Sequence, residues 1–313
     1  MKRRHKKAAS DDSIVMAPLN DQLTPGERRN AAIELSDLVT RIVTYVICHA
    51  IVDHEPLLKE ERMSIAHAFL QRVTTTHMCN HKLTAEGIVF EYGGQTFQLH
   101  EEYKTMTLTR SVYEHLAMFY FLYEHPRTDE ERTLVWNYWK MNSKKNLLND
   151  ISSEEASAAG EQQHLQQELE ELRSQILSSP LGRQHFVKLA DWTRLASQPH
   201  NGTIEFFTEK GKPDVRKVSY TQAWKYLYRT EDMALIYRHL SMHCHPVHSG
   251  LVQYQNQSDS DQGDDVIPLY LSSSFLAYLC RLYLKTIPDG KDMLRLGFTE
   301  HELSIFHALS RLH

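Results

Sequence analysis

The sequence has few cysteines, no long apolar run and no excess of charge of one sign. Four cysteines without paired spacing do not predict a disulfide framework, and reduced core thiols in the cytosol are the natural interpretation. The longest apolar run, residues 116–123, is too short to span a membrane. A net charge of -5 excludes a global nucleic-acid signature, so contact with RNA or DNA requires a local basic face. The cysteines are Cys48, Cys79, Cys244 and Cys280.

The chain of 313 residues is long enough to bury a sizeable core, and its 41% hydrophobic content is that of a folded protein. Residues 1–22 begin with a cluster of lysines and arginines that is followed by polar residues and not by an apolar run. This pattern predicts a disordered basic arm and no signal peptide. We therefore expect a cytoplasmic protein in which residues 23–313 form a single helical domain.

Apolar residues recur at helical spacing along most of the chain. Thr24 and Pro25 are the residue types of an N-cap and a first helical position, so they are expected to open a long helix. In residues 86–99 the pattern changes to two short β-prone runs around Gly93 and Gly94, which indicates a hairpin. The predicted fold class is mainly α, a helical bundle with a small β-hairpin insertion. Further helices are expected near residues 55–75, 102–125, 219–227, 231–244 and 271–287, and after the capping box that begins at Thr299.

Three other segments differ from their surroundings in composition. Residues 154–178 carry leucines and an isoleucine at helical steps, which predicts a helical arm that either packs on its own bundle or contacts another subunit. Residues 183–217 are rich in basic and aromatic side chains, a composition that suits a phosphate backbone beside a stacking surface. Residues 253–265 are polar and acidic but lack the EF-hand spacing, which indicates a flexible loop.

A charge pair lies on the most apolar of the predicted helices. Arg110 and Glu114 are four residues apart, so an intrahelical salt bridge is one interpretation. Because Arg before Glu is the weaker order and a buried unpaired charge is costly, partners on another helix are also expected. The pair is either structural or part of the wall of a site.

The stretch most indicative of function is residues 237–246, near the end of a predicted helix. At about 100° per residue, Arg238, Ser241 and His245 fall on one stripe of this helix. Pro246 is expected to end the helix, which leaves His245 at a C-terminus where the helix dipole favours the imidazolium. A guanidinium, a hydroxyl and an imidazole therefore line up.

Residues 237–246, preceded by an apolar helix with Arg110 and Glu114 and followed by another apolar helix, resemble a HEPN-like family of bacterial proteins over about residues 30–290. This resemblance implies a HEPN-like helical bundle that is often a dimer. Many HEPN proteins are metal-independent ribonucleases, so it also implies an endoribonuclease that could serve as a toxin or phage-defence effector with an antitoxin partner.

The HEPN motif is an arginine followed, after four to six residues, by a histidine. Arg238 and His245 match this spacing, and His239 takes the place of the polar residue that often follows the arginine. His243 also fits the spacing, but it lies about 140° from Arg238 around the helix, compared with about 20° for His245. His245 is therefore the expected catalytic histidine.

RNA cleavage without a metal needs a base for the 2′-hydroxyl, an acid for the leaving 5′-oxygen, and positive charge near the phosphorus. A histidine with an ordinary pKa of about 6.5 can be base or acid near neutral pH, and an arginine supplies fixed donors for phosphate oxygens. We expect Arg238 and His245 to be catalytic, with Ser241 orienting either group. In a homodimer, two facing stripes would supply two histidines. The expected substrate-binding residues, toward RNA or a nucleotide, are Tyr237, His239, Arg110 and Glu114.

Two other interpretations stay open. A histidine that caps helix carbonyls, beside an arginine paired with Glu114, would leave the same pattern in a non-catalytic nucleotide- or nucleic-acid-binding module or a structural dimer protein. The other takes four histidines as metal ligands, although the HExxH pattern and a nearby acidic ligand are absent, so neither a metal nor a cofactor is expected. These histidines are His239, His243, His245 and His248.

Overall fold

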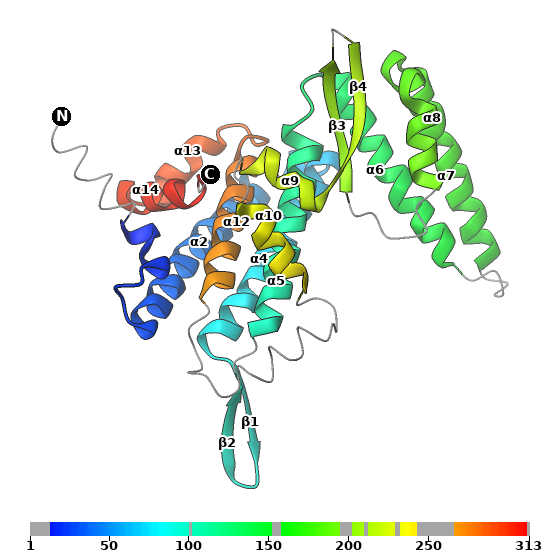
Figure 1. Ribbon diagram of the computed structural model, residues 1–313. Helices are drawn as coiled ribbons and strands as arrows, with labels where there is room; N and C mark the ends of the chain where they lie inside the picture. The colour runs from blue at the N-terminus through cyan, green and yellow to red at the C-terminus, as the bar shows by residue number, and fades with distance from the viewer. Residues whose placement is uncertain are drawn as a thin grey trace. The chain divides into compact units, whose positions relative to one another are not determined.

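The computed structural model describes residues 13–99, 102–151, 158–194, 202–209, 212–228, 232–242 and 266–311. These residues form helices and small two-stranded antiparallel sheets (Figure 1), which confirms the mainly α fold class. The chain divides into two compact units, of which unit 1 is Met1–Ala117 with Trp224–His313 and unit 2 is Met118–Ala223. Because two compact units can still unfold together, the single domain expected over residues 23–313 stays a prediction.

Three long helices pack against one another to form the core of unit 1 (Figure 1). Most of α12 is buried, whereas α2 and α4 each bury one apolar stripe against their neighbours. Thr24 caps α2 as predicted, because its hydroxyl accepts a hydrogen bond from the N–H of Glu27. The three helices are α2 (Pro25–Asp53), α4 (Glu61–Ala85) and α12 (Ile267–Leu284). The unit also contains η1 (Ala17–Leu19), α3 (Glu55–Leu58), α10 (Asp232–Met242), α13 (Gly290–Gly297) and α14 (Glu300–Leu309). The sequence boundaries between the two units fall within α5 (Glu102–Phe119) and α9 (Tyr220–Leu227).

The helix predicted over residues 55–75 is two helices, α3 and α4, and α4 continues to Ala85. The threonines at the predicted end, residues 74–76, each donate a hydroxyl hydrogen bond to the carbonyl four residues earlier. These bonds satisfy the hydroxyls inside the helix, so the threonines are compatible with its continuation. A further helix, α13, follows Asp289, whose φ of 59° lies in the left-handed region.

The predicted hairpin is present as β1 (Ile88–Tyr92) and β2 (Gln95–Leu99). Gly93 and Gly94 join the strands with φ values of 62° and 77°, the positive values that a two-residue turn of this kind requires. Figure 1 shows the hairpin projecting beyond the ends of α4 and α5. Tyr92 is 78% exposed, in keeping with this position.

Ordered structure begins inside the predicted N-terminal arm. Residues 13–20 form a helical turn and η1, and the side chains of Val15 and Pro18 are buried. Residues 1–12 lie outside the described residues, as does the acidic loop expected over residues 253–265.

The prediction that the cysteines are core thiols is wrong for two of them. Cys48 and Cys79 are exposed, whereas Cys280 is buried, and burial raises the pKa of the Cys280 thiol. Cys48 and Cys79 lie on the outer faces of α2 and α4, so an apolar helical context was not enough to place them inside. Cys244 lies outside the described residues.

Two helices, α2 and α12, are long and apolar enough to cross a membrane by length and composition alone. The core helix of a folded domain passes the same test, and 89% of the relevant window of α12 is buried, compared with 44% of that of α2. The packing of α12 between α2 and α4 accounts for its composition. Absence of membrane contact stays a prediction.

Unit 2 is built on three neighbouring helices (Figure 1). The predicted arm is α7, and Leu165, Leu172 and Ile176 on its apolar stripe are buried. Lys144 on α6 and Glu168 on α7 form an ion pair of 2.7 Å, so the arm packs on its own chain, as one of the two expectations had it. The helices are α6 (Asp129–Asp150), α7 (Ala158–Ser178) and α8 (Pro180–Arg194), and the five-residue π-helix η2 (Tyr120–Glu124) precedes them.

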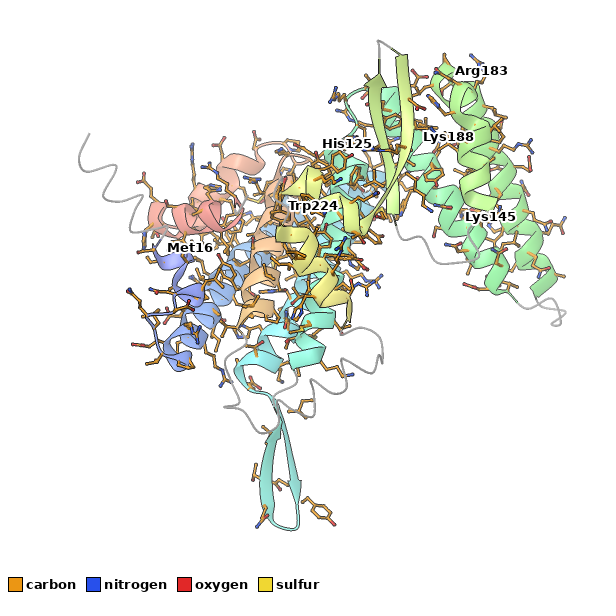
Figure 2. The ribbon with its side chains drawn as sticks, in the orientation of Figure 1. Met16, His125, Lys145, Arg183, Lys188 and Trp224 are labelled. Atoms are coloured by element: carbon orange, nitrogen blue, oxygen red, sulfur yellow. The ribbon has the colours of Figure 1, made fainter. Side chains whose placement is uncertain are left out.

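A second hairpin, β3 (Gly202–Glu209) with β4 (Lys212–Ser219), was not predicted. One charged residue of this hairpin, Glu205, is buried, and it pairs across the strands with the exposed Arg216 at 2.6 Å. The strand edges are held by side chains. His125 accepts a hydrogen bond from the N–H of Phe206 at 3.3 Å, and Lys188 on α8 donates to the carbonyl of Val215 on β4 at 2.6 Å (Figure 2).

Candidate functional site

One carboxylate oxygen joins α5 to α10. The phenolic hydroxyl of Tyr237 on α10 donates to Oε1 of Glu114 on α5 at 2.8 Å, and Nε of Arg110 donates to the same oxygen at 2.7 Å. The Arg110 guanidinium also lies 5.6 Å from the centre of the Tyr237 ring. Three of the predicted site residues therefore form one cluster, which we call the α5–α10 clamp.

The α5–α10 clamp is largely removed from solvent. Tyr237 is 6% exposed, and the side chains of Arg110 and Glu114 are 21% and 26% exposed. Burial and the Glu114 carboxylate raise the pKa of Tyr237 to about 12, so the phenol stays protonated and remains a donor. The expectation that the Arg110–Glu114 pair contacts another helix thus matches the geometry, and the contact is neutral phenol to carboxylate.

The ring of Tyr113 packs against the clamp and adds apolar contact between the same helices. Tyr113, on α5, has its ring centre 5.1 Å from that of Tyr237 at an angle of 45°. Burial raises the pKa of Tyr113 as well, and the nearby Tyr237 and Glu114 act in the same direction. A tyrosine next to a partly buried carboxylate stays uncharged, so Tyr113 adds no negative charge beside Glu114.

Of the remaining described residues of the predicted motif, Ser241 lies one turn beyond Tyr237, whereas Arg238 and His239 lie on other faces of α10. Arg238 and His239 are exposed. Ser241 is half-buried and donates its hydroxyl hydrogen bond to the carbonyl of Tyr237 at 2.7 Å, within the same helix. Such a bond is common for serine in a helix and occupies the hydroxyl proton. Position 238 is therefore the point at which the described part of α10 presents a cation to solvent.

His245 lies outside the described residues, so the alignment of Arg238, Ser241 and His245 on one stripe stays a prediction. Three of the four histidines of the metal interpretation, His243, His245 and His248, also lie outside the described residues. Within the described ranges, no group of three His, Cys, Asp or Glu side chains is arranged to hold a metal ion.

Sequence reasoning did not single out a second polar cluster, which lies among α2, α4 and α12. The side chain of His77 is fully buried between the hydroxyls of Ser36 and Ser272, at 2.9 and 2.8 Å. A signal was available, since His77 continues the apolar stripe of Leu70 and Val73 on α4 at steps of three and four. A histidine on such a stripe must find polar partners inside the core.

The fold and the α5–α10 clamp define a mainly helical protein whose conspicuous polar contacts join helices within its core. The chain belongs to the family of unknown function DUF5677, whose model matches residues 100–264, just over half of the 313 residues. This stretch includes the clamp and the described part of α10. No curated protein and no solved structure matches the chain.

Proposed function

We propose that this protein binds RNA and cleaves it without a metal ion, in the manner of HEPN-type endoribonucleases. The observation that carries the proposal is Arg238, an exposed guanidinium on α10 that directly follows the anchored Tyr237. A guanidinium on a fixed helix is suited to a phosphate, since its planar set of N–H donors matches the phosphate oxygens and the helix sets the place where the cation emerges. The sequence adds His245 seven positions later.

The roles divide between contact with the substrate and support of the helix. Arg238 holds the phosphate and stabilises the charge that develops on it, and His245 transfers protons to and from the ribose oxygens. The hydrogen bond from Tyr237 to Glu114 fixes α10 on α5. The proposal also includes contact between the substrate and four residues at or next to the clamp, Arg110, Glu114, Tyr237 and His239. A homodimer in the cytoplasm that acts as a toxin or in phage defence, with an antitoxin partner, belongs to the same proposal.

The test is incubation of the purified protein with total RNA in the presence of EDTA. We expect fragments with 2′,3′-cyclic phosphate ends, and we expect Arg238→Ala and His245→Ala each to abolish them. Arg295→Ala and His301→Ala are matched controls, because both residues lie on exposed positions of α13 and α14 far along the chain from the motif. Intact RNA at micromolar protein would end the nuclease proposal.

A second candidate is a non-catalytic module that binds nucleotides or nucleic acid. The clamp favours it in one respect, because the Glu114 carboxylate and the Tyr237 hydroxyl satisfy each other instead of facing a substrate. Gel shifts with RNA and with nucleotides separate the candidates. Binding that Arg238→Ala weakens and His245→Ala leaves unchanged, without cleavage, would support the binding module.

A further inference from the structure

Four successive contacts connect the surface of unit 1 to a buried serine on α12. Nε2 of His81 lies 3.6 Å from Oδ1 of Asp37, and Nδ1 of His81 lies 2.9 Å from Oγ of Ser36. The same Ser36 oxygen lies 2.9 Å from Nε2 of His77, and Nδ1 of His77 lies 2.8 Å from Oγ of Ser272. Two imidazoles and two hydroxyls therefore alternate behind one carboxylate.

The two ends of this chain of contacts differ in access to water. The side chain of Asp37 is 62% exposed and that of His81 is 24% exposed, while Ser36, His77 and Ser272 are each 0% exposed. Asp37 and Ser36 belong to α2, the two histidines to α4, and Ser272 to α12. All five residues lie outside residues 100–264, so the chain of contacts is separate from the family match and from α10.

The number of protons fixes the direction of these hydrogen bonds. When His81 is neutral, the carboxylate of Asp37 favours the proton on Nε2, so Nδ1 of His81 accepts from the hydroxyl of Ser36. Ser36 has given its only proton, so its oxygen accepts from Nε2 of His77. Nδ1 of His77 then accepts from the hydroxyl of Ser272. In this state His77 is the Nε2–H tautomer.

Protonation of His81 reverses this order. Both nitrogens of the imidazolium donate, one to Asp37 and one to Ser36, so Ser36 turns its hydroxyl proton toward Nε2 of His77. We propose that His81, Ser36, His77 and Ser272 form a pH-sensitive relay in which protonation of His81 moves the single proton of His77 from Nε2 to Nδ1. The balance is one net proton, taken from solvent and held on His81. His77 breaks its Nε2–H bond and releases that proton to solvent, and it forms its Nδ1–H bond with another proton from solvent, while both serines keep one proton each.

The groups that face the relay are consistent with a neutral His77. From α2 the charged neighbour of His81 is Asp37, from its own helix it is His77, and α12 contributes the uncharged Ser272. Arg29 of α2 lies one turn further along α4, where its guanidinium donates to the carbonyls of Thr84 and Ala85. Burial first and the nearby His81 second lower the pKa of His77 to about 3, against an opposite effect of the Ser36 backbone, so the added proton stays on His81.

The inner end of the relay lies at a contact between α12 and α5. In the acid state Ser272 accepts from His77, and its own proton becomes available to the carbonyl of Pro268, four residues earlier in the helix. That carbonyl also faces the hydroxyl of Thr109 on α5 at 2.8 Å, and Thr109 has a second acceptor, the carbonyl of Thr105, at the same distance. Thr109 precedes Arg110 of the α5–α10 clamp in the sequence.

The test is nuclear magnetic resonance of the imidazole nitrogens in the ¹⁵N-labelled full-length protein between pH 8 and pH 5. We expect the two nitrogens of His77 to exchange their protonated and unprotonated chemical shifts with the midpoint at which His81 titrates. His67 is the matched control, because it also bridges α4 and α12, with Nδ1 2.8 Å from the hydroxyl of Tyr283, but contacts neither relay serine. Its tautomer should stay the same.

Two variants test the connection without relying on acid. In His81→Lys the cation is permanent, so His77 should be the Nδ1–H tautomer at pH 8. In Ser36→Ala the link is cut, and His77 should no longer follow His81. The proposal is overturned if His77 keeps its Nε2–H tautomer in the wild type while His81 titrates. That result would mean that Nε2 of His77 keeps its proton whatever the state of His81, with the backbone of Ser36 as a further hydrogen-bond partner of His77.

Discussion

Tyr237 and Glu114 are 123 positions apart in the sequence, and the hydroxyl of one lies 2.8 Å from the carboxylate of the other. This bond orients α10 on α5, and it does so through a phenol that stays neutral because burial raises its pKa to about 12. A charged arginine in place of the phenol would bring a second desolvated cation next to Arg110. The neutral donor avoids that cost.

Tyr237→Phe should lower the free energy of unfolding by about 1–2 kcal/mol, because it removes the donor and leaves a partly buried carboxylate oxygen with one partner fewer. Urea denaturation followed by circular dichroism measures the change. Tyr92→Phe, at a position that is 78% exposed on the hairpin, is the matched control and should change stability by less than about 0.5 kcal/mol. Equal stabilities of Tyr237→Phe and wild type would show that the bond contributes nothing.

Arg238→Ala should leave stability within about 0.5 kcal/mol of the wild type, because the side chain is exposed on α10. The same denaturation experiment provides the measurement. This separates the effect of Arg238→Ala on RNA from an effect on folding. A loss of several kcal/mol would instead assign the guanidinium a structural role.

Gly182→Ala should destabilise unit 2 by about 2 kcal/mol or more, because overpacking against a fixed atom forces the backbone to move. A Cβ at position 182 would lie 1.9 Å from the carbonyl oxygen of Ile176, at the corner between α7 and α8. Gly160→Ala is the matched control, since a Cβ at that position in α7 meets no atom within 4 Å. It should be neutral or stabilising by up to about 1 kcal/mol. Thermal unfolding of both variants measures the contrast.

Acid should destabilise the protein through its buried histidines. Burial lowers the pKa of His77 to about 3 and also lowers the pKa values of His67, His115 and His125. The unfolded chain then binds protons at higher pH than the folded chain, so this stability is complete above about pH 6.5 and is lost as the pH falls toward the folded values. One such histidine accounts for up to about 1.4 kcal/mol per pH unit.

Urea midpoints measured at pH 7.5, 6.0 and 5.0 check this expectation. The urea midpoint should fall less steeply with decreasing pH in His77→Gln, because this variant has no titrating group at position 77. The variant should nevertheless be less stable than the wild type at pH 7.5. A stability that stays flat between pH 7.5 and 5.0 would contradict a neutral core of histidines.

Glu302→Gln should lower stability at pH 7 by about 0.5–1 kcal/mol, the scale of a surface ion pair at a helix N-terminus. Hydrogen bonds from the N–H and hydroxyl of Thr299, together with Arg41 at 2.9 Å, lower the pKa of Glu302 to about 2. A lowered pKa stabilises the fold above the ordinary value of 4.5, and the contribution disappears as the pH falls toward 2. The difference in the free energy of unfolding between variant and wild type should therefore be smaller at pH 3 than at pH 7. The same difference at both pH values would contradict this prediction.

Local sequence signals were enough for the capped and glycine-joined elements. Thr24 with Glu27, Thr299 with Glu302, and the Gly93–Gly94 turn each depend on residues within four positions of one another. Propensity and capping act over that range, so the pattern alone predicts them. The length of α4 and the β3–β4 hairpin were not predicted, and the contacts seen there, such as the cross-strand pair of Glu205 with Arg216, become visible only in the folded chain.

The site could be predicted only in part for the same reason. Arg110 and Glu114 were found because they are four residues apart, and the need for a partner on another helix followed from the cost of a buried charge. That the partner is Tyr237 could not be derived, because the contact is set by how α5 and α10 pack. Ser36 and Ser272 were overlooked as partners of His77, since serines in an apolar stripe look like ordinary small residues until the helices are assembled.

The edges of the β3–β4 hairpin are occupied by side chains of the same unit, His125 at the N–H of Phe206 and Lys188 at the carbonyl of Val215. A foreign polypeptide that seeks to extend this sheet finds those two backbone groups already bonded, which guards the unit against amyloid-like stacking. The hydrogen bond at the edge of β3 requires that Nε2 of His125 is unprotonated, because this nitrogen is the acceptor. Acid turns that nitrogen into a donor, which removes the acceptor from the N–H of Phe206 and leaves this backbone group on the strand edge without its His125 partner.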